Sequence, residues 1–157
     1  MEWVAWLVAC LMVIQLAEHQ LHLRVMHKKT WFVSAWHRHV VEHHGKKRTD
    51  INVDMPFSIP QMAAVPVYIV LAIFGQWLVM GIVFALLLFY SYVWTKLHRA
   101  MHGLEDNWLG RSRGFGYWCD HHLAHHNHPS KNLATVFPWM DALLGTKVRA
   151  KAAVPEA

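Results

Sequence analysis

The longest uncharged segment, Met55–Thr95, limits what this chain can fold into. It has no Asp, Glu, Lys, Arg or His over 41 consecutive residues, and Gly75 and Gln76 lie near its middle. Because an α-helix rises about 1.5 Å per residue, about 20 residues cross the roughly 30 Å hydrocarbon core of a bilayer. The segment therefore predicts two membrane-spanning helices, at about 57–74 and 76–97, with a tight turn at Gly75.

A third apolar segment, Trp3–Ala17, predicts another span near the start of the chain. It has no charge until Glu18 and continues without a helix breaker, so we expect one helix over about 3–27. The competing interpretation, a secretory signal peptide, would require a basic start and a small-residue cleavage site, and the sequence has neither. Within 57–74, Pro66 predicts a kink, because proline lacks the N–H of a helical hydrogen bond.

The distribution of positive charge predicts the orientation. All 15 Lys and Arg lie either in Arg24–Arg48 or from Lys96 onward, and such residues concentrate on the cytoplasmic side of membrane proteins. The sequence thus predicts an all-α integral membrane protein, a single domain over 1–157, with its N-terminus outside and a cytoplasmic helical cap made of 28–56 and 98–157. Contact with anionic headgroups explains the formal net charge of +5, so no nucleic acid is expected as a partner.

Histidines are the second unusual feature of the sequence. All 14 lie at or beyond the predicted cytoplasmic end of a span, and neutral imidazole is a common ligand of zinc, iron and copper. Since one metal takes about four to six ligands, about ten converging histidines indicate two metals. The four groups are His19, His22 and His27; His37, His39, His43 and His44; His98 and His102; and His121, His122, His125, His126 and His128.

Spacing within the groups predicts how the side chains meet. Positions three or four apart share a helical face, so His98 and His102 are predicted to converge. His22 and His27 are five positions apart, about 140° around a regular helix, so we expect them to reach different points. Two metal centres side by side account for that offset. Further sets at helical spacing are His122, His125 and His126, and His39, His43 and His44.

Clustered histidines also occur in proteins without a two-metal site. A lone histidine at a membrane interface is commonly an anchor, a pH sensor uses clustered histidines at no fixed spacing, and a purification tag is a terminal run. A metal transporter would need ionisable residues inside its spans, whereas Met55–Thr95 has none. A sensor or scaffold with structural zinc would need fewer ligands. Four spaced groups at one membrane face favour a two-metal site.

The order of the histidine boxes resembles a known enzyme superfamily. In chain order the boxes are HxxxxH at His22 and His27, HxxxHH at His39, His43 and His44, HxxxH at His98 and His102, and HxxHH at His122, His125 and His126. With two predicted spans after the second box and the tail NLATVFPWMDALLGT after the last, the chain from about Glu18 to Thr146 resembles the fatty acid hydroxylase / sterol desaturase superfamily of integral-membrane di-iron enzymes. The second box departs from the family's usual HxxHH because its first position is Val40. An HxxxHH box occurs among related desaturases, which makes His39 the ligand and His37 the alternative.

The resemblance implies a membrane-bound oxidoreductase that binds two iron ions. Such an enzyme uses O2 to hydroxylate an unactivated C–H bond of a membrane lipid, and the alternative activity at the same site is lipid desaturation. Zinc is an alternative occupant of the imidazole sites, and no catalytic residue beyond the metal ligands is implied. The implied ligands are His22, His27, His39, His43, His44, His98, His102, His122, His125 and His126.

Electrons are expected from a separate protein. Cys10 and Cys119 are too few for an Fe–S cluster, and the sequence has no dinucleotide-binding motif. The resemblance implies a cytoplasmic donor such as a ferredoxin or a cytochrome b5-like protein, and an acidic donor would dock on basic residues. The chain is short for the superfamily, so a homo-oligomer is also considered. The basic candidates are Lys28, Lys29, Lys46, Lys47, Arg48, Arg111 and Arg113; their alternative role is binding anionic lipid.

Acidic residues near the boxes are candidates for orienting the ligands. An imidazole ligand needs its second N–H fixed by a neighbouring acceptor. Glu18, Glu42 and Asp120 are the nearest acids in sequence, and together with His121 they are the predicted partners of the ligand rings. Asp141 is expected instead to cap or pin the terminal segment.

Overall fold

The computed structural model describes residues 2–149, and every regular element within that range is a helix. The first helix, α1 (Glu2–Leu21), continues without a break into a π-helix, η1 (His22–Met26). A second continuous helix consists of α2 (Val33–Trp36) and the π-helix η2 (His37–Gly45). The helix expected over 3–27 is therefore present, but its last turn is wider than an α-helical turn.

The uncharged segment forms three helices. They are α3 (Ser58–Ala63), α4 (Val65–Ile73) and α5 (Trp77–Met101). The kink expected at Pro66 is a full break between α3 and α4. Pro66 offers no N–H to the carbonyl of Met62, so the helical hydrogen bonds are interrupted at the junction, Ala64. Gly75 adopts a φ of +65° and reverses the chain before α5, as the sequence predicts.

Within residues 2–149, α5 is the helix with both the length and the composition of a membrane span. The mean hydropathy of its most apolar 18-residue window is 2.0. α3 and α4, with 6 and 9 residues, are each too short to cross a bilayer as one helix. The structure thus has one candidate membrane helix, and three spans with a cytoplasmic cap stay a prediction.

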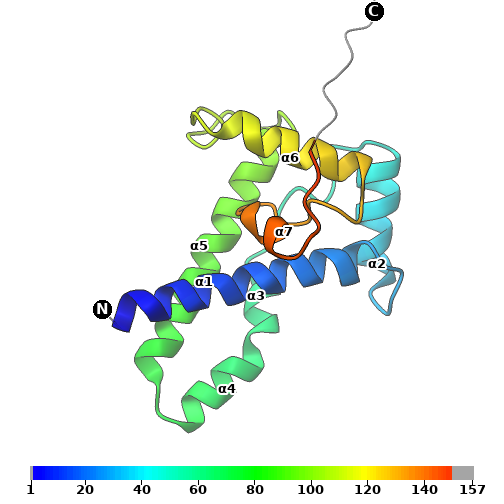
Figure 1. Ribbon diagram of the computed structural model, residues 1–157. Coiled ribbons are helices and arrows are strands. Elements are labelled where there is room, and N and C mark those ends of the chain that lie inside the picture. The colour runs from blue at the N-terminus through cyan, green and yellow to red at the C-terminus, as the bar shows by residue number, and fades with distance from the viewer. Residues whose placement is uncertain (1, 150–157) are drawn as a thin grey trace, which may run out of the picture.

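The helices are arranged around the crossing of α1 and α5. Figure 1 shows α1 (blue) running across α5 (green) instead of alongside it. α4 and α5 form a hairpin that extends away from the rest of the chain, whereas η2 and α6 (Phe115–Asn127) gather at the opposite end of α5. The short helix α7 (Trp139–Leu143) packs on α1. All four histidine boxes lie at the end of α5 remote from the hairpin.

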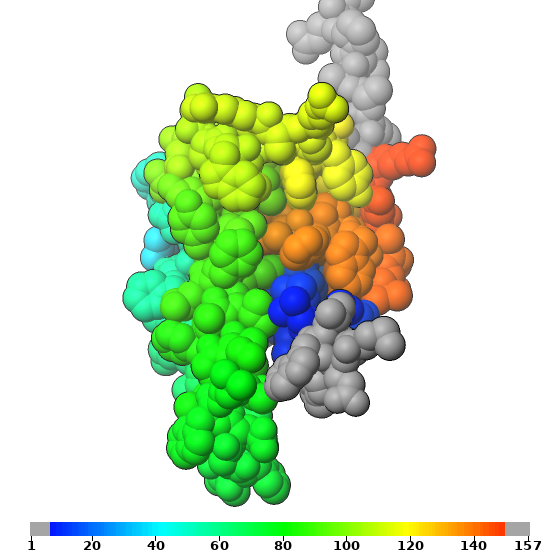
Figure 2. All heavy atoms as spheres, turned by 90° about the vertical axis from the view of Figure 1, so that its left-hand side faces the viewer, coloured from blue at the N-terminus to red at the C-terminus, as the bar shows by residue number. Residues whose placement is uncertain are grey.

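Apolar side chains cover the outside of the hairpin. Ile73, Phe74, Trp77 and Leu78 at its tip are each more than half exposed, and Figure 2 shows the hairpin protruding below the rest of the molecule. Soluble monomers rarely expose contiguous apolar surface of this kind. The hairpin surface is therefore suited to contact with lipid.

A small buried core joins the crossing helices to the C-terminal part of the described chain. Tyr90 and Trp94 of α5 pack with Val136, and Ile14 of α1 lies against this cluster. Leu97, Leu133 and Met140 are almost completely buried near it. This core fixes the ends of α1 and α5, which carry the first and third histidine boxes.

Candidate metal centre

Five histidine side chains from three helices form the first histidine group. Nε2 of His39 lies 2.9 Å from Nε2 of His22, 3.0 Å from that of His27 and 3.2 Å from that of His44. Nε2 of His27 lies 3.2 Å from Nε2 of His125. One ring nitrogen from each of His22, His27, His39 and His125 falls within 4.8 Å of every other.

The second histidine group lies directly beside the first. Nε2 of His122 is 3.2 Å from that of His98, 2.9 Å from that of His102 and 3.0 Å from that of His126. His43 completes the set, because its ring nitrogen lies within 4.8 Å of those of His98, His102 and His122. The stacked rings of His44 and His126, with centroids 4.3 Å apart, connect the two groups.

The prediction that His22 and His27 reach different points is wrong. Both rings belong to the first group, with centroids 5.1 Å apart. The reason is the π-helix: the N–H of His27 donates to the carbonyl of His22 at 3.1 Å, an i→i+5 bond. Residues five apart are then one turn apart and share a face.

A π-helix also changes which histidines pair in the second box. The sequence predicts His39 with His43, four positions apart, but η2 is also a π-helix, with the N–H of Lys46 donating to the carbonyl of Val41. His39 therefore contacts His44, and His43 turns toward the second group. His37, the alternative to His39, is exposed and lies 4.0 Å from Glu42.

The fourth box is also divided between the groups. His122 and His126, four positions apart, converge as predicted, but His125 joins the first group. Consecutive residues on an α-helix point about 100° apart, so neighbouring side chains of α6 reach to either side of its axis. The expected convergence of all three histidines is thus wrong for His125.

Backbone carbonyls fix the outer nitrogen of three rings. Nδ1 of His22 lies 2.6 Å from the carbonyl oxygen of Leu133, and Nδ1 of His125 lies 2.8 Å from that of Lys131. Nδ1 of His43 lies 3.2 Å from the carbonyl oxygen of Arg48. A carbonyl only accepts, so each Nδ1 carries the proton, and in a neutral ring the Nε2 lone pair faces the group.

Several converging lone pairs without donors are suited to a cation. Buried Nε2 of His43, a ring whose Nδ1 is held by the carbonyl of Arg48, has no hydrogen-bond partner. Neutral rings that face one another with unprotonated nitrogens cannot all be satisfied by hydrogen bonds. The donor set of each group fits an imidazole-rich site for a transition metal.

Burial keeps these rings in the form that binds metal. The pKa of His44 falls to about 3 and that of His102 to about 4, chiefly because burial penalises the charged ring, and neighbouring histidines lower both further. For the same reasons the pKa values of His39 and His125 lie well below 6.5. The groups therefore stay neutral at physiological pH and can coordinate a metal.

The acids predicted to orient the ligands have other partners. Glu18 accepts hydrogen bonds from the hydroxyl of Tyr90, from Nε1 of Trp94 at 2.7 Å and from the N–H of Thr135 at 3.0 Å. Glu42 pairs with Lys46 at 2.8 Å. Closeness in sequence does not bring these carboxylates to the rings, because side chains next to one another on a helix point in different directions.

Asp120 and His121 also lie apart from the ring nitrogens of the two groups. Asp120 is exposed, and Nε2 of His121 lies 3.1 Å from Oδ2 of Asp141. The role expected for Asp141 is the one observed, since it is fully buried and accepts hydrogen bonds from the segment after α6. Although burial alone would raise the pKa of Asp141, hydrogen bonds from His121, Thr146 and backbone N–H groups hold it below its usual value.

Sequence reasoning missed the groups that do contact the rings. The side-chain amide of Asn52 lies 2.7 Å from Nδ1 of His39, and the carbonyls of Arg48, Lys131 and Leu133 contact other rings. A backbone carbonyl leaves no signature in the sequence. Asn52 had one weak signal, because asparagine is enriched at positive φ in turns, and its φ is +59°.

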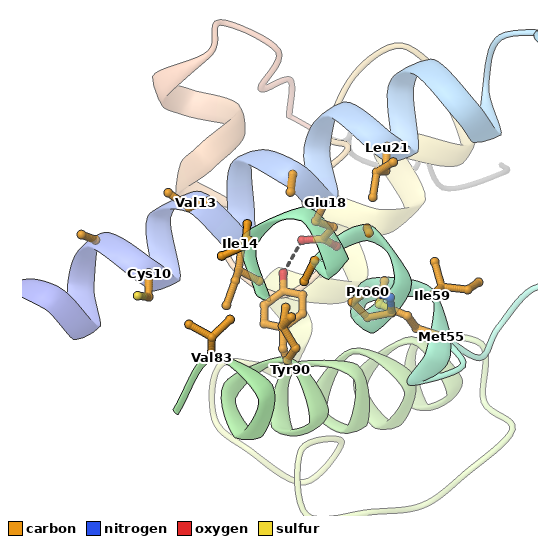
Figure 3. A pocket seen from close by; sticks show the side chains of 16 residues that line it. Cys10, Val13, Ile14, Glu18, Leu21, Met55, Ile59, Pro60, Val83 and Tyr90 are labelled. Atoms are coloured by element: carbon orange, nitrogen blue, oxygen red, sulfur yellow. Dashed lines mark hydrogen bonds between the residues drawn. The ribbon is translucent and has the colours of Figure 1, made fainter. Parts of the chain in front are cut away.

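An apolar cavity lies along α1, N-terminal to the first histidine box. It has a volume of about 330 Å³ and lies between α1, α3 and α5, reaching Leu21, the residue before His22. Figure 3 shows Glu18 and Tyr90 hydrogen-bonded to each other in its wall, among apolar side chains. Ligand pockets typically combine an apolar lining with a few polar groups, so this cavity can hold an apolar chain.

Comparison with known proteins agrees with the geometry. The family model described as fatty acid hydroxylase matches residues 7–146, which include all four histidine boxes, the cavity and α7. No curated protein and no solved structure matches the chain. The match covers most of the sequence, and the chain therefore belongs to the fatty acid hydroxylase family.

Proposed function

We propose that this protein is a membrane-bound oxidoreductase that hydroxylates an unactivated C–H bond of a lipid, using two iron ions and O2. The observation that carries the proposal is the pair of five-histidine groups. An apolar cavity extends along α1 as far as Leu21, the residue before His22. Membership of the fatty acid hydroxylase family supports the lipid substrate and the oxidation chemistry. Desaturation at the same site is the alternative, because both reactions begin by removing a hydrogen atom from the chain.

The first histidine group would hold one metal and the second group the other. When bound, the two ions with O2 would supply the oxidant that an unactivated C–H bond requires. The protein's own part is to fix the rings, exclude water and align the substrate. Carbonyl groups hold the proton on Nδ1 of His22, His43 and His125, which leaves Nε2 of each ring free to coordinate.

The cavity would position the lipid. Its lining from α1, α3 and α5 is almost entirely apolar, and along α1 it extends to Leu21, the residue before His22. An apolar chain entering from the bilayer would lose contact with lipid but gain equivalent packing, so entry costs little. The buried pair of Glu18 and Tyr90 would mark the limit of the apolar wall.

Electrons would come from a separate cytoplasmic donor, such as a ferredoxin or a cytochrome b5-like protein. Of the seven basic candidates, Lys46, Arg48 and Arg111 pair with acids of the chain itself. An acidic donor gains more from cations that are not already paired. The better docking candidates are therefore Lys28, Lys29, Lys47 and Arg113, which are all exposed.

Metal analysis of the purified protein tests the two-metal site. We expect two metal ions per chain, and about one after His98→Ala, because Nε2 of His98 contacts two members of the second group. His37→Ala is the matched control and should retain two, since that ring is exposed. One ion or none in the unaltered protein would contradict the proposal.

Lipid analysis tests the reaction. Cells that express the protein should accumulate a hydroxylated lipid, or a desaturated one if the alternative is correct. Cells that express His122→Ala should not, because His122 contacts three members of the second group. Identical lipids in both cultures would count against either activity.

A further inference from the structure

The segment that joins α6 to α7, residues 128–138, contacts the first histidine group through its backbone. The carbonyl of Leu133 accepts from Nδ1 of His22 at 2.6 Å, and the carbonyl of Lys131 accepts from Nδ1 of His125 at 2.8 Å. Both rings belong to the first group. The position of this α6–α7 loop therefore sets the orientation of two rings in that group.

Asp141 of α7 fixes this loop. Oδ1 accepts the N–H of Leu133 at 2.8 Å and the hydroxyl of Thr146 at 2.6 Å. Oδ2 accepts the N–H of Ala134 at 2.8 Å and lies 3.1 Å from Nε2 of His121. The carboxylate is fully buried, and Nε2 of His19 also lies 3.4 Å from Oδ1.

Two further contacts hold the loop in the same place. The side-chain amide of Asn132, which has a φ of +51°, donates to the carbonyl of His121 at 3.0 Å. Glu18 accepts the N–H of Thr135 at 3.0 Å. Asp141 is nevertheless the group that binds the N–H of Leu133, the residue whose own carbonyl orients His22.

Three rings of the second histidine group, those of His43, His98 and His102, are held by other parts of the chain. Nδ1 of His43 contacts the carbonyl of Arg48, after η2. His98 and His102 are held by α5, where the ring of Trp94 lies 4.5 Å from that of His98. Among the described residues, the loop contacts of Asp141 lead to Nδ1 of His22 and His125, and its contact with α6 is to His121, whose ring belongs to neither group.

We propose that Asp141 is a positioning residue for the first metal site alone, acting through the α6–α7 loop on the rings of His22 and His125. It touches neither metal nor substrate, so it is not a catalytic residue. The inference rests on the proposed two-metal function. Its consequence is that one buried carboxylate sets the affinity of one metal site independently of the other.

The test measures each site by itself with Co²⁺, which reports imidazole coordination through its visible absorbance. His98→Ala weakens the second site and leaves the first to be titrated, whereas His22→Ala does the reverse. Asp141→Asn is then added to each variant. The amide nitrogen cannot accept an N–H, so the loop must shift away from at least one of its present contacts.

We expect Asp141→Asn to weaken Co²⁺ binding by about 10- to 100-fold in the His98→Ala protein, the usual effect of losing a group that orients a ligand. In the His22→Ala protein it should leave Co²⁺ binding unchanged. Equal weakening in both proteins, or no change in either, would overturn the inference. Unaltered protein that binds fewer than two metals would overturn both this inference and the proposed function.

Two further variants keep the result interpretable. Thr146→Val removes a hydrogen bond to Oδ1 of Asp141 together with the contact of that hydroxyl to Nε2 of His19. It should show the same site preference with a smaller effect, even if Asp141→Asn does not fold. Ser91→Ala is the matched control, because it removes a buried hydroxyl that donates to the carbonyl of Leu87 within α5. It should change neither affinity, and a selective loss of the first site in Ser91→Ala would overturn the inference.

Discussion

At the scale of single residues, three histidine rings are oriented by contacts at Nδ1, the ring nitrogen that points away from the histidine group. The histidine groups are built from Nε2 atoms, but carbonyls at Nδ1 decide which nitrogen is free in His22, His43 and His125. Tautomer control of this kind usually raises ligand basicity as well as fixing ring orientation. For these three histidines, the carbonyl that holds Nδ1 supports a role as metal ligand in addition to their place in a box.

The lowered histidine pKa values predict how metal-free protein responds to acid. Unfolded rings take up protons near pH 6.5, whereas folded His44 does so only near pH 3 and folded His102 near pH 4. The free energy of unfolding should therefore be highest above about pH 6.5 and should fall as pH decreases from 6.5 toward 4. Each extra proton bound by the unfolded chain contributes a slope of about 1.4 kcal/mol per pH unit.

Denaturant unfolding in detergent micelles between pH 8 and pH 5 measures this dependence. His44→Gln should reduce the slope between pH 6.5 and pH 5, while His37→Gln, which alters an exposed ring, should leave it unchanged. A free energy of unfolding that stays constant down to pH 5 would show that the rings are not held neutral.

At the scale of elements, two π-helices determine which histidines meet. η1 brings His22 and His27 together, and η2 brings His39 and His44 together, each pair five positions apart. π-helical turns are rare and frequently occur at functional sites. In this protein the wider turn changes the spacing that converges from four residues to five.

Exchanging neighbours within η1 tests the importance of this spacing. Met26→His combined with His27→Met places the histidines four apart, as on an α-helix. Because the turn at this point is π-helical, we expect Co²⁺ affinity at the first site to fall about as far as in His27→Ala. The control is Met101→His with His102→Met in the regular helix α5, where positions three and four apart share a face.

The control exchange should retain more affinity at the second site than the η1 exchange retains at the first. Binding of Co²⁺ by the exchanged η1 protein as tight as in the unaltered protein would show that the turn can return to α-helical spacing. The π-helix would then not determine the site.

For the whole molecule, the crossing of α1 and α5 separates two tasks. The ends of these helices carry the first and third histidine boxes, and η2 and α6 carry the other two. The space between α1, α5 and α3 forms the apolar cavity. The family match over residues 7–146 includes both parts. Substrate binding and metal binding are therefore expected to respond to different substitutions.

Val83→Phe tests this separation, because Val83 lines the cavity from α5. The larger ring should occupy space needed by the lipid, so turnover should fall by about tenfold or more while two metals stay bound. Ile82→Phe is the matched control. Ile82 is the residue next to Val83, but its side chain is 38% exposed and does not line the cavity. Lipid turnover and metal content should be measured on the same preparations. A loss of metal in Val83→Phe would contradict the separation of substrate binding from metal binding.

Much of the fold and site could be predicted from local sequence pattern. The turn at Gly75, the helical class and the convergence of His98 with His102 follow from composition and from the regular period of an α-helix. The sequence predicts a kink at Pro66, whereas the structure has two separate helices, α3 and α4, at this point. The pairings in the first and second boxes and the place of His125 in the fourth were not predictable from that period, since η1 and η2 do not follow it and His125 joins the first group.

The sequence by itself determined that the chain is helical, that it carries a long uncharged segment and that its histidines form four boxes of an enzyme family. These properties depend on residue type and spacing along the chain. Only the tertiary structure decided that His125 lies apart from His126, that carbonyls hold the rings where acids were expected, and that Asp141 fixes the α6–α7 loop. The physical reason is that these contacts join segments distant in sequence through backbone atoms, which are the same in every residue.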